Sequence, residues 1–319
     1  MATRARTASE QITETVTAWP GVTAGEGSRG EFAFRLGRRE LGHLHGDRTF
    51  HVGLPKPVWH ELHDQGRIDF HPVFPGAPGY GARRIAGEDD VRDVIAILRM
   101  NYDRAVERHG LVPGLHALPA GQLSFAPRLE ARGFLLEREQ GNVVVYGAPG
   151  LAGAAGRVEE LGGATRQYLS HWHEAMFDGA ALGVPLVAHE AERGEVEERG
   201  LRLRGTFSRR HTLDDDLEVI PIPGHTAGAT ALLWHSGGLR VLFTGDTVWV
   251  DDGRWVAAVL GSSDRDAYVA SLELLRDVEF DALAPWVTNR GAPAIRPVGP
   301  AEARRRLDVL VEEVRDGGG

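Results

Sequence analysis

Three short segments, each joined to an apolar run, bring together the histidines and the aspartate that most constrain this chain. The first reads Ser-His-Trp-His-Glu and carries His171 and His173, the second reads Pro-Gly-His-Thr-Ala-Gly around His225, and the third reads Phe-Thr-Gly-Asp-Thr around Asp246. Two histidines at positions i and i+2 of an extended segment point to the same side. Proline and glycine force a tight turn at His225, and loops at strand ends commonly carry function. We therefore expect these four side chains to converge on one metal ion.

The choice of metal follows from the ligand atoms that the chain can offer. There is no cysteine, so thiolate sites, disulfides and a cysteine nucleophile are excluded. A bound ion must use nitrogen and oxygen ligands, and three imidazoles with one carboxylate form a complete set for zinc or for ferrous iron. We expect one divalent ion, with zinc first and iron or manganese as alternatives.

Composition and charge are ordinary for a soluble globular protein. Hydrophobic residues make up 42% of the 319 residues and charged residues 25%, which suffices for a sizeable core. The formal net charge of -9 argues against nucleic acid or an anionic membrane as a partner. No apolar run approaches the roughly 20 residues of a membrane span, and the N-terminus lacks the apolar core of a signal peptide. We expect a cytoplasmic protein; the sequence does not predict its oligomeric state.

The pattern of elements changes near residue 112. Before it, a helix near 10–18, strands near 31–36, 40–45 and 50–54, and helices at 57–65 and 89–108 form an α+β pattern. A glycine- and proline-containing stretch at 109–121 suits a linker or a domain edge. After it, strands alternate with helices, which predicts an α/β sandwich. We expect a small α+β domain at 1–112 and an α/β domain at 113–319.

The order of the three motifs, His-x-His, Pro-Gly-His-Thr-x-Gly and Phe-Thr-Gly-Asp-Thr, resembles that of the metallo-β-lactamase superfamily over residues 113–319. The resemblance implies an αββα sandwich with its site at one edge of two facing sheets. It also implies that His171, His173 and His225 form a three-histidine pocket. Asp246 would be the carboxylate that normally bridges to a second metal.

The chain departs from that family where the second metal would bind. The family pattern is His-x-His-x-Asp-His, but Ala175 and Met176 stand at the last two positions, and Trp286 stands where the family's final histidine should fall. The departures favour a mononuclear site. Glu174 and Asp178 flank the gap and are candidates to replace a ligand or to orient the imidazoles, although Glu174 is one place off the pattern.

We interpret this domain as a metal-dependent hydrolase that uses activated water on an ester, thioester or similar bond of a small molecule. Asp246 is expected to orient the water or to bind the metal directly, with Glu174 as the second candidate catalytic group. Two alternatives remain: a non-catalytic binding domain of the same fold, and a mononuclear iron dioxygenase that uses His171, His225 and Asp246.

Residues near 28–108 resemble the luciferase-domain family of bacteria and fungi. The matching segments are Glu-Leu-Gly-His-Leu-His-Gly-Asp at 40–47, Val-Gly-Leu-Pro at 52–55, Gly-Arg-Ile-Asp-Phe-His-Pro at 66–72 and Leu-Arg-Met-Asn-Tyr at 98–102. The resemblance implies no defined chemistry. His43, His45 and His71 could form a second metal or ligand site, or could be exposed side chains of a strand and a loop. No nucleotide loop, flavin motif or nucleophile elbow is found, so we expect no organic cofactor.

Overall fold

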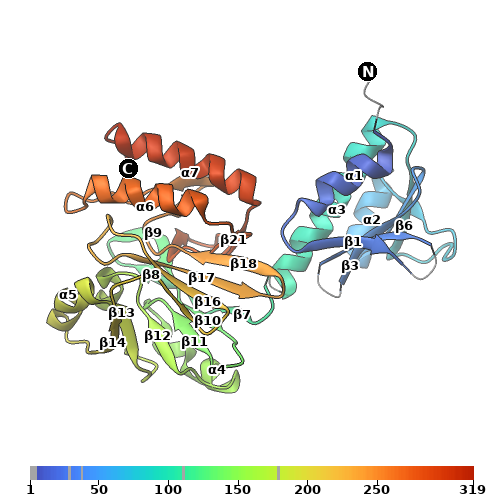
Figure 1. Cartoon of the computed structure of the whole chain (residues 1–319). Coiled ribbons are helices and arrows are strands. Elements are labelled where there is room, and N and C mark those ends of the chain that lie inside the picture. The colour runs from blue at the N-terminus through green and yellow to red at the C-terminus, as the bar shows by residue number, and fades with distance from the viewer. Residues whose placement is uncertain (1–5, 28–29, 37–38, 110–111, 178–179) are drawn as a thin grey trace. The chain divides into compact units, whose positions relative to one another are not determined.

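A computed structural model describes residues 6–27, 30–36, 39–109, 112–177 and 180–319. The chain forms two compact units, residues 1–111 and residues 112–319, which are described separately below. Figure 1 shows the elements of both units along the chain. In the described part of the chain, no helix is both long and apolar enough to cross a membrane.

The first unit is built on a six-stranded sheet in the order β1-β2-β3-β4-β6-β5, with antiparallel pairing throughout. The strands are β1 (Val22–Glu26), β2 (Phe32–Leu36), β3 (Arg39–His45), β4 (Thr49–Gly53), β5 (Asp69–Phe70) and β6 (Tyr80–Arg84). The helices are α1 (Ala8–Thr17), α2 (Lys56–Asp64) and α3 (Glu88–His109). This is the mixed α and β composition expected for the N-terminal part.

Helices α1 and α3 pack on one another, and α3 also packs on β3. A capping box begins α1, in which the Thr7 hydroxyl and the Glu10 side chain bind each other's backbone N–H groups. Val94, Leu98 and Tyr102 recur at helical spacing along α3 and are fully buried. The periodic apolar face of α3 thus supplies much of the core of this unit.

The second unit contains three sheets. The first has the order β14-β13-β12-β11-β10-β7, the second β15-β16-β17-β18-β21-β23, and the third β20-β19-β22-β9-β8. The strands of the first sheet are β7 (Leu115–Ala117), β10 (Phe134–Leu136), β11 (Val143–Val145), β12 (Arg166–Tyr168), β13 (Leu186–His189) and β14 (Leu203–Phe207). Those of the second are β15 (His211–Leu213), β16 (Leu217–Pro221), β17 (Thr230–Ser236), β18 (Leu239–Phe243), β21 (Ala282–Leu283) and β23 (Arg296–Pro297). Those of the third are β8 (Gly121–Leu123), β9 (Ala126–Ala131), β19 (Trp249–Asp251), β20 (Arg254–Val256) and β22 (Val287–Asn289).

Helices cover the outer faces of the first and second sheets, which gives the expected αββα layers (Figure 1). On the first sheet, Val196 of α5 (Arg193–Glu198) packs with buried residues of β13 and β14. On the second, α6 (Arg265–Asp277) and α7 (Pro300–Arg315) share one apolar cluster with β16, β17 and β18. Between the two sheets, the ring of Phe134 in β10 lies 5.4 Å from the ring of Phe243 in β18. The prediction of an αββα sandwich is confirmed.

Two local expectations differ from the structure. The segment that carries the first two histidines is extended only at His171, because the 3-10 helix η2 (Trp172–Met176) begins directly after it. His173 therefore reaches its position through a helical turn and not through strand alternation. The stretch at 109–121, expected to be a linker or a domain edge, contains the boundary between the two units, but it also contains the strand β7, which pairs with β10. Asp178 lies outside the described residues.

Candidate metal centre

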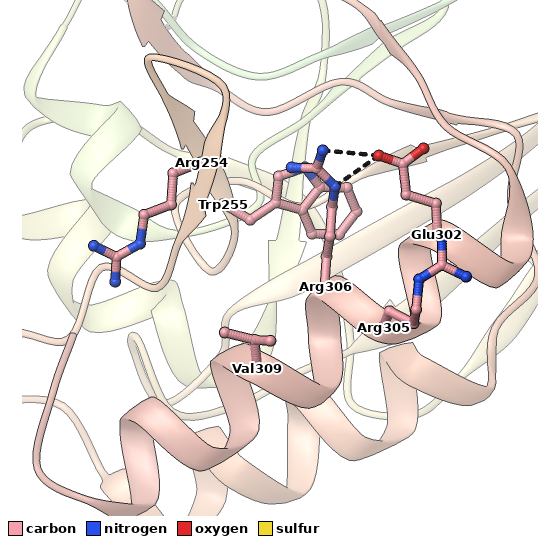
Figure 2. A pocket seen from close by; sticks show the side chains of 6 residues that line it. All are labelled: Arg254, Trp255, Glu302, Arg305, Arg306 and Val309. Carbon is pink, nitrogen blue, oxygen red and sulfur yellow. Dashed lines mark hydrogen bonds and ion pairs between the residues drawn. The ribbon is translucent and has the colours of Figure 1, made fainter.

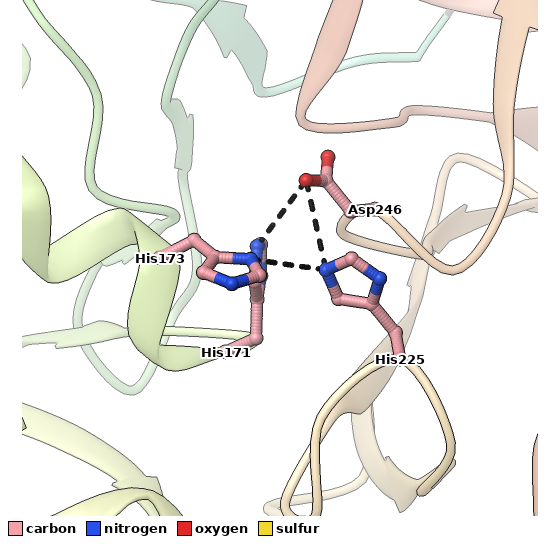
Figure 3. A group of neighbouring side chains, drawn as sticks. All are labelled: His171, His173, His225 and Asp246. Carbon is pink, nitrogen blue, oxygen red and sulfur yellow. Dashed lines mark hydrogen bonds and ion pairs between the residues drawn. The ribbon is translucent and has the colours of Figure 1, made fainter. Parts of the chain in front are cut away.

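Side chains from three connections of the second unit meet at one point. His171 follows β12, His173 lies in η2, His225 lies in the turn between β16 and β17, and Asp246 follows β18. One ligand atom from each of the four side chains lies within 4.8 Å of every other, and Figure 3 shows them pointing toward one another. The sequence-predicted set is therefore brought together in space, from connections of both the first and the second sheet.

The separations between these atoms match the edges of a metal coordination polyhedron. Nδ1 of His173 is 3.1 Å from Nε2 of His225. Oδ2 of Asp246 is 3.4 Å from Nε2 of His171 and 3.8 Å from Nε2 of His225. Metal–ligand bonds of about 2.0–2.2 Å in a tetrahedron require ligand atoms roughly 3.3 Å apart. The four groups thus enclose a space of the right size for one ion.

Hydrogen bonds orient two of the imidazoles toward this space. Nδ1 of His171 lies 2.9 Å from the Ser170 hydroxyl and 3.2 Å from a Glu174 carboxylate oxygen. Nδ1 of His225 donates to the carbonyl oxygen of Ala258 at 2.7 Å. With the Nδ1 protons held in this way, the Nε2 lone pairs of neutral rings face inward. Nε2 of His171 is buried within the cluster and faces Oδ2 of Asp246 at 3.4 Å.

The metal-free cluster concentrates its charge on one imidazole. Burial lowers the pKa of His171, but hydrogen bonds with Asp246 and Glu174 outweigh it and raise the pKa to about 10. Burial and then the charge of His171 lower the pKa of His225 to about 4; burial, His171 and His225 lower that of His173 to about 3. Burial would raise the pKa of Asp246, yet the hydrogen bond with His171 keeps it below its usual value. One imidazolium therefore lies between carboxylates where a divalent cation would be equally well neutralised.

Glu174 lies behind His171 and is not one of the four converging groups. Its side chain is fully buried, and its carboxylate accepts hydrogen bonds from the backbone N–H groups of Ser170 at 2.9 Å and Gly147 at 2.7 Å. Glu174 therefore orients His171 and fixes the loop after β12. Of the three parts considered for it from the sequence, the orientation of an imidazole fits this arrangement and the replacement of a missing ligand does not. Its part as a catalytic group stays a prediction.

Glu192 is a positioning residue that sequence reasoning missed. It is 1% exposed, and its two carboxylate oxygens accept hydrogen bonds from the backbone N–H groups of Trp172 and Gly228, both at 2.6 Å. It thereby joins the peptide between His171 and His173 to the turn that carries His225. In the sequence Glu192 belongs to an acidic run, which is more typical of an exposed surface, so no signal distinguished it.

Two glycines are required by close packing at the centre. Gly224 has a φ of 139°, and a side chain there would strike the backbone of Tyr268 in α6. Gly245 has a φ of 57°, and a side chain there would strike Ser170. Because both glycines precede a predicted ligand, they explain why Pro-Gly-His and Gly-Asp occur at these turns.

The residues at the positions of the missing ligands carry no imidazole or carboxylate. The ring of Trp286 lies 5.1 Å from the ring of His171, and its Nε1 donates to the Gly147 carbonyl at 2.6 Å. Ala175 is buried, whereas Met176 is 48% exposed. In the described residues of this unit, no second group of three or more His, Asp or Glu side chains converges in the way the first does.

A separate surface pocket of about 420 Å³ lies where β20 meets α7 (Figure 2). The arginine side chains of this pocket are partly neutralised, since Arg306 pairs with Glu302 and Arg254 pairs with Glu313. It is lined by Arg254, Trp255, Glu302, Arg305, Arg306 and Val309. None of the four converging side chains lines it, so it is not part of the candidate metal centre.

Comparisons with known proteins found two family models and a set of solved structures similar to parts of the chain. Residues 138–285 match the model of the metallo-beta-lactamase superfamily, and residues 38–101 match that of the Luciferase domain. No curated protein matches the chain. The DIM-1 metallo-beta-lactamase is 18% identical with a TM-score of 0.48, covering 63% of this chain and 98% of its own. The metallo-beta-lactamase from Pontibacter korlensis is 17% identical with a TM-score of 0.47, covering 62% and 94%.

All four converging residues lie inside the matched range 138–285, and Trp286 directly follows it. The chain is therefore similar to the Luciferase domain at residues 38–101 and to the metallo-beta-lactamase superfamily at residues 138–285.

Proposed function

We propose that the second unit is a mononuclear metal-dependent hydrolase that acts on an ester, thioester or similar bond of a small molecule. The single observation that carries this proposal is the convergence of His171, His173, His225 and Asp246 within 4.8 Å. The buried Nε2 of His171, which faces the carboxylate of Asp246, and the spacing of the ligand atoms support a fit to one divalent ion of the zinc class.

A divalent ion held by the three imidazoles, with Asp246 orienting a water in the fourth position, would activate that water near neutral pH and polarise a carbonyl oxygen. The residues of the chain would do the rest. Glu174 and the Ala258 carbonyl hold His171 and His225 in the tautomers that expose Nε2. Asp246, at 17% side-chain exposure, is the group of the cluster that can accept a proton from water or orient it.

A single ion favours acyl bonds over phosphodiesters. Two-ion sites stabilise the attacking and leaving oxygens of a phosphodiester together. Here Trp286 stands beside His171 in place of a ligand, and its indole hydrogen-bonds to Gly147. The net charge of -9 also argues against a polyanionic substrate. A small carbonyl substrate is therefore our first choice.

The test begins with the full chain purified without added metal. We expect zinc by elemental analysis, and turnover of a nitrophenyl ester or an acyl thioester that a chelator abolishes and zinc restores. Asp246→Asn should lose turnover while it keeps part of the metal, and His235→Ala, which changes an exposed histidine of β17, should behave as wild type.

Two other results would redirect the assignment. Iron in the isolated protein, with oxygen consumption in place of hydrolysis, would favour the dioxygenase, because His171, His225 and Asp246 also suit ferrous iron. A folded chain that takes up no divalent ion at the second unit would favour a binding domain, for which the replacement of ligands by Ala175, Met176 and Trp286 is the supporting observation.

A further inference from the structure

Histidines also gather in the first unit, on one face of its sheet. His43 and His45 lie two residues apart on β3, and His51 of β4 is the direct cross-strand partner of His43. His71 follows β5 and approaches from the other side of β4. The ring of His51 lies 5.2 Å from that of His43, 4.8 Å from that of His45 and 4.1 Å from that of His71. Strand alternation and strand register together create this arrangement.

Three of the rings offer ligand atoms at metal-binding distances. One ring nitrogen from each of His43, His51 and His71 lies within 4.8 Å of the others. Nε2 of His71 is 3.0 Å from Nδ1 of His51, close to the roughly 3.3 Å that separates two imidazole ligands of one tetrahedral ion. His51 is 7% exposed, and its Nε2 is buried without a hydrogen-bond partner in the described residues.

One of the rings is already oriented by a carboxylate. Nδ1 of His43 is 2.6 Å from an oxygen of Glu40, so the Nδ1 proton is held there and the Nε2 lone pair is free. A carboxylate behind a ligating histidine is a common feature of metal sites, because it fixes the tautomer and raises the basicity of the ring. The same relationship exists between Glu174 and His171 in the second unit.

We propose that His43, His51 and His71 bind a divalent transition metal ion of the zinc class, independently of the centre in the second unit. The set of three imidazoles without a thiolate suits zinc, copper, nickel or cobalt better than calcium or magnesium. Three protein ligands leave a coordination position for water or an external ligand.

Metal binding changes which ring nitrogen of His71 carries the proton. In the metal-free arrangement, Nδ1 of His71 accepts a hydrogen bond from the backbone N–H of Val73 at 3.1 Å, so Nε2 carries the proton and donates it to His51. To ligate through Nε2, His71 must move its proton to Nδ1, and the Val73 N–H must leave that atom. Val73 is 69% exposed, so its amide can turn to water. Binding therefore changes the tautomer of His71.

The experiment uses the full chain with His171→Ala and His225→Ala, which removes two ligands of the second unit's centre. We expect this variant to retain one equivalent of Zn²⁺ or Co²⁺ after gel filtration, with Co²⁺ giving the visible absorption of a low-symmetry nitrogen site. Adding His51→Ala should abolish retention, and adding His60→Ala, which changes an exposed histidine of α2, should not.

Two further measurements separate loss of ligands from loss of structure. His43→Gln and His71→Gln change only partly buried rings, and each should lower retention while the circular dichroism spectrum is kept. Nitrogen NMR of the imidazoles should show Nδ1 of His71 becoming protonated when Zn²⁺ is added. The proposal is overturned if the background variant retains no ion, or if His43→Gln and His71→Gln retain it as well as the background does.

Discussion

The carboxylate of Glu192 accepts a hydrogen bond from the backbone N–H of Trp172 at 2.6 Å and so holds the peptide that lies between His171 and His173. Its other oxygen holds Gly228, three residues after His225. One buried side chain therefore sets the distance between two segments that each supply metal ligands. Glu192 is not a ligand and affects metal binding only through the position of the backbone. Its effect can therefore be measured in a variant that keeps all four ligands.

Glu192→Gln is expected to weaken metal binding by the second unit about 10- to 100-fold, the usual effect of losing a residue that orients ligands. The amide can accept only one of the two backbone hydrogen bonds, so the two segments drift apart. Zinc affinity measured by competition with a chelator checks this. Glu190→Gln, an exposed change in the same turn, is the matched control. Equal affinities in the two variants would contradict the role given to Glu192.

His171→Ala is expected to abolish the metal held by the second unit while the circular dichroism spectrum stays nearly unchanged. The change removes a converging Nε2, and the surrounding loop is still held by Glu174 through Ser170 and Gly147. Elemental analysis should be done with His51→Ala also present, so that only this centre is counted. Undiminished metal in that protein would show that His171 is not a ligand.

The second unit is expected to hold at most one ion per chain. In a His51→Ala and His71→Ala background, saturation with zinc followed by gel filtration should leave one equivalent, because Ala175, Met176 and Trp286 offer no ligand atoms. Titration calorimetry gives an independent count. Two tightly held ions in this background would mean that other side chains serve in their place.

Trp286→Phe is expected to leave this metal count unchanged but to lower the free energy of unfolding by about 1–3 kcal/mol. The phenyl ring cannot donate to the buried carbonyl of Gly147, which the indole reaches at 2.6 Å. Urea denaturation of the metal-free protein measures the loss. A changed metal count, or an unchanged free energy of unfolding, would contradict the purely structural role given to the indole.

Acid should weaken the second unit partly through Asp216. Burial would raise the pKa of Asp216, but hydrogen bonds from Arg138 and Trp234 lower it below the usual value. A carboxyl group with a lowered pKa in the folded state stabilises the fold above its unfolded pKa of about 4, and that contribution is lost as pH falls through the folded pKa.

Asp216→Asn is therefore expected to cost about 1–3 kcal/mol at pH 7, because the buried guanidinium of Arg138 loses a charged partner. The variant should also show a shallower loss of stability below pH 4. Asp215→Asn, at the exposed neighbouring position, is the control. Thermal unfolding between pH 3 and pH 7 compares the three proteins, and parallel curves for wild type and Asp216→Asn would contradict the assignment.

The sequence predicted the sandwich and the four converging side chains because strand-end motifs are local and appear directly in the order of residues. It did not predict that His173 sits in a 3-10 turn, since His-x-His alone does not fix the backbone between the rings. Glu192 was missed because its partners are backbone amides far along the chain, which no side-chain pattern records. His51 was missed because its place in the histidine cluster of the first unit depends on the register of β3 and β4, which pairs it with His43.

The four groups of the second unit come from connections of two different sheets, and this has a mechanical consequence. His171 belongs to the first sheet's side, and Asp246 directly follows the strand β18 of the second. An ion bound by both residues would link the two sheets at the edge that carries the site. Loss of the ion would let the loops at this edge open more often, while the opposite edge of the sandwich stays packed. Amide hydrogen exchange should therefore become faster first in these loops.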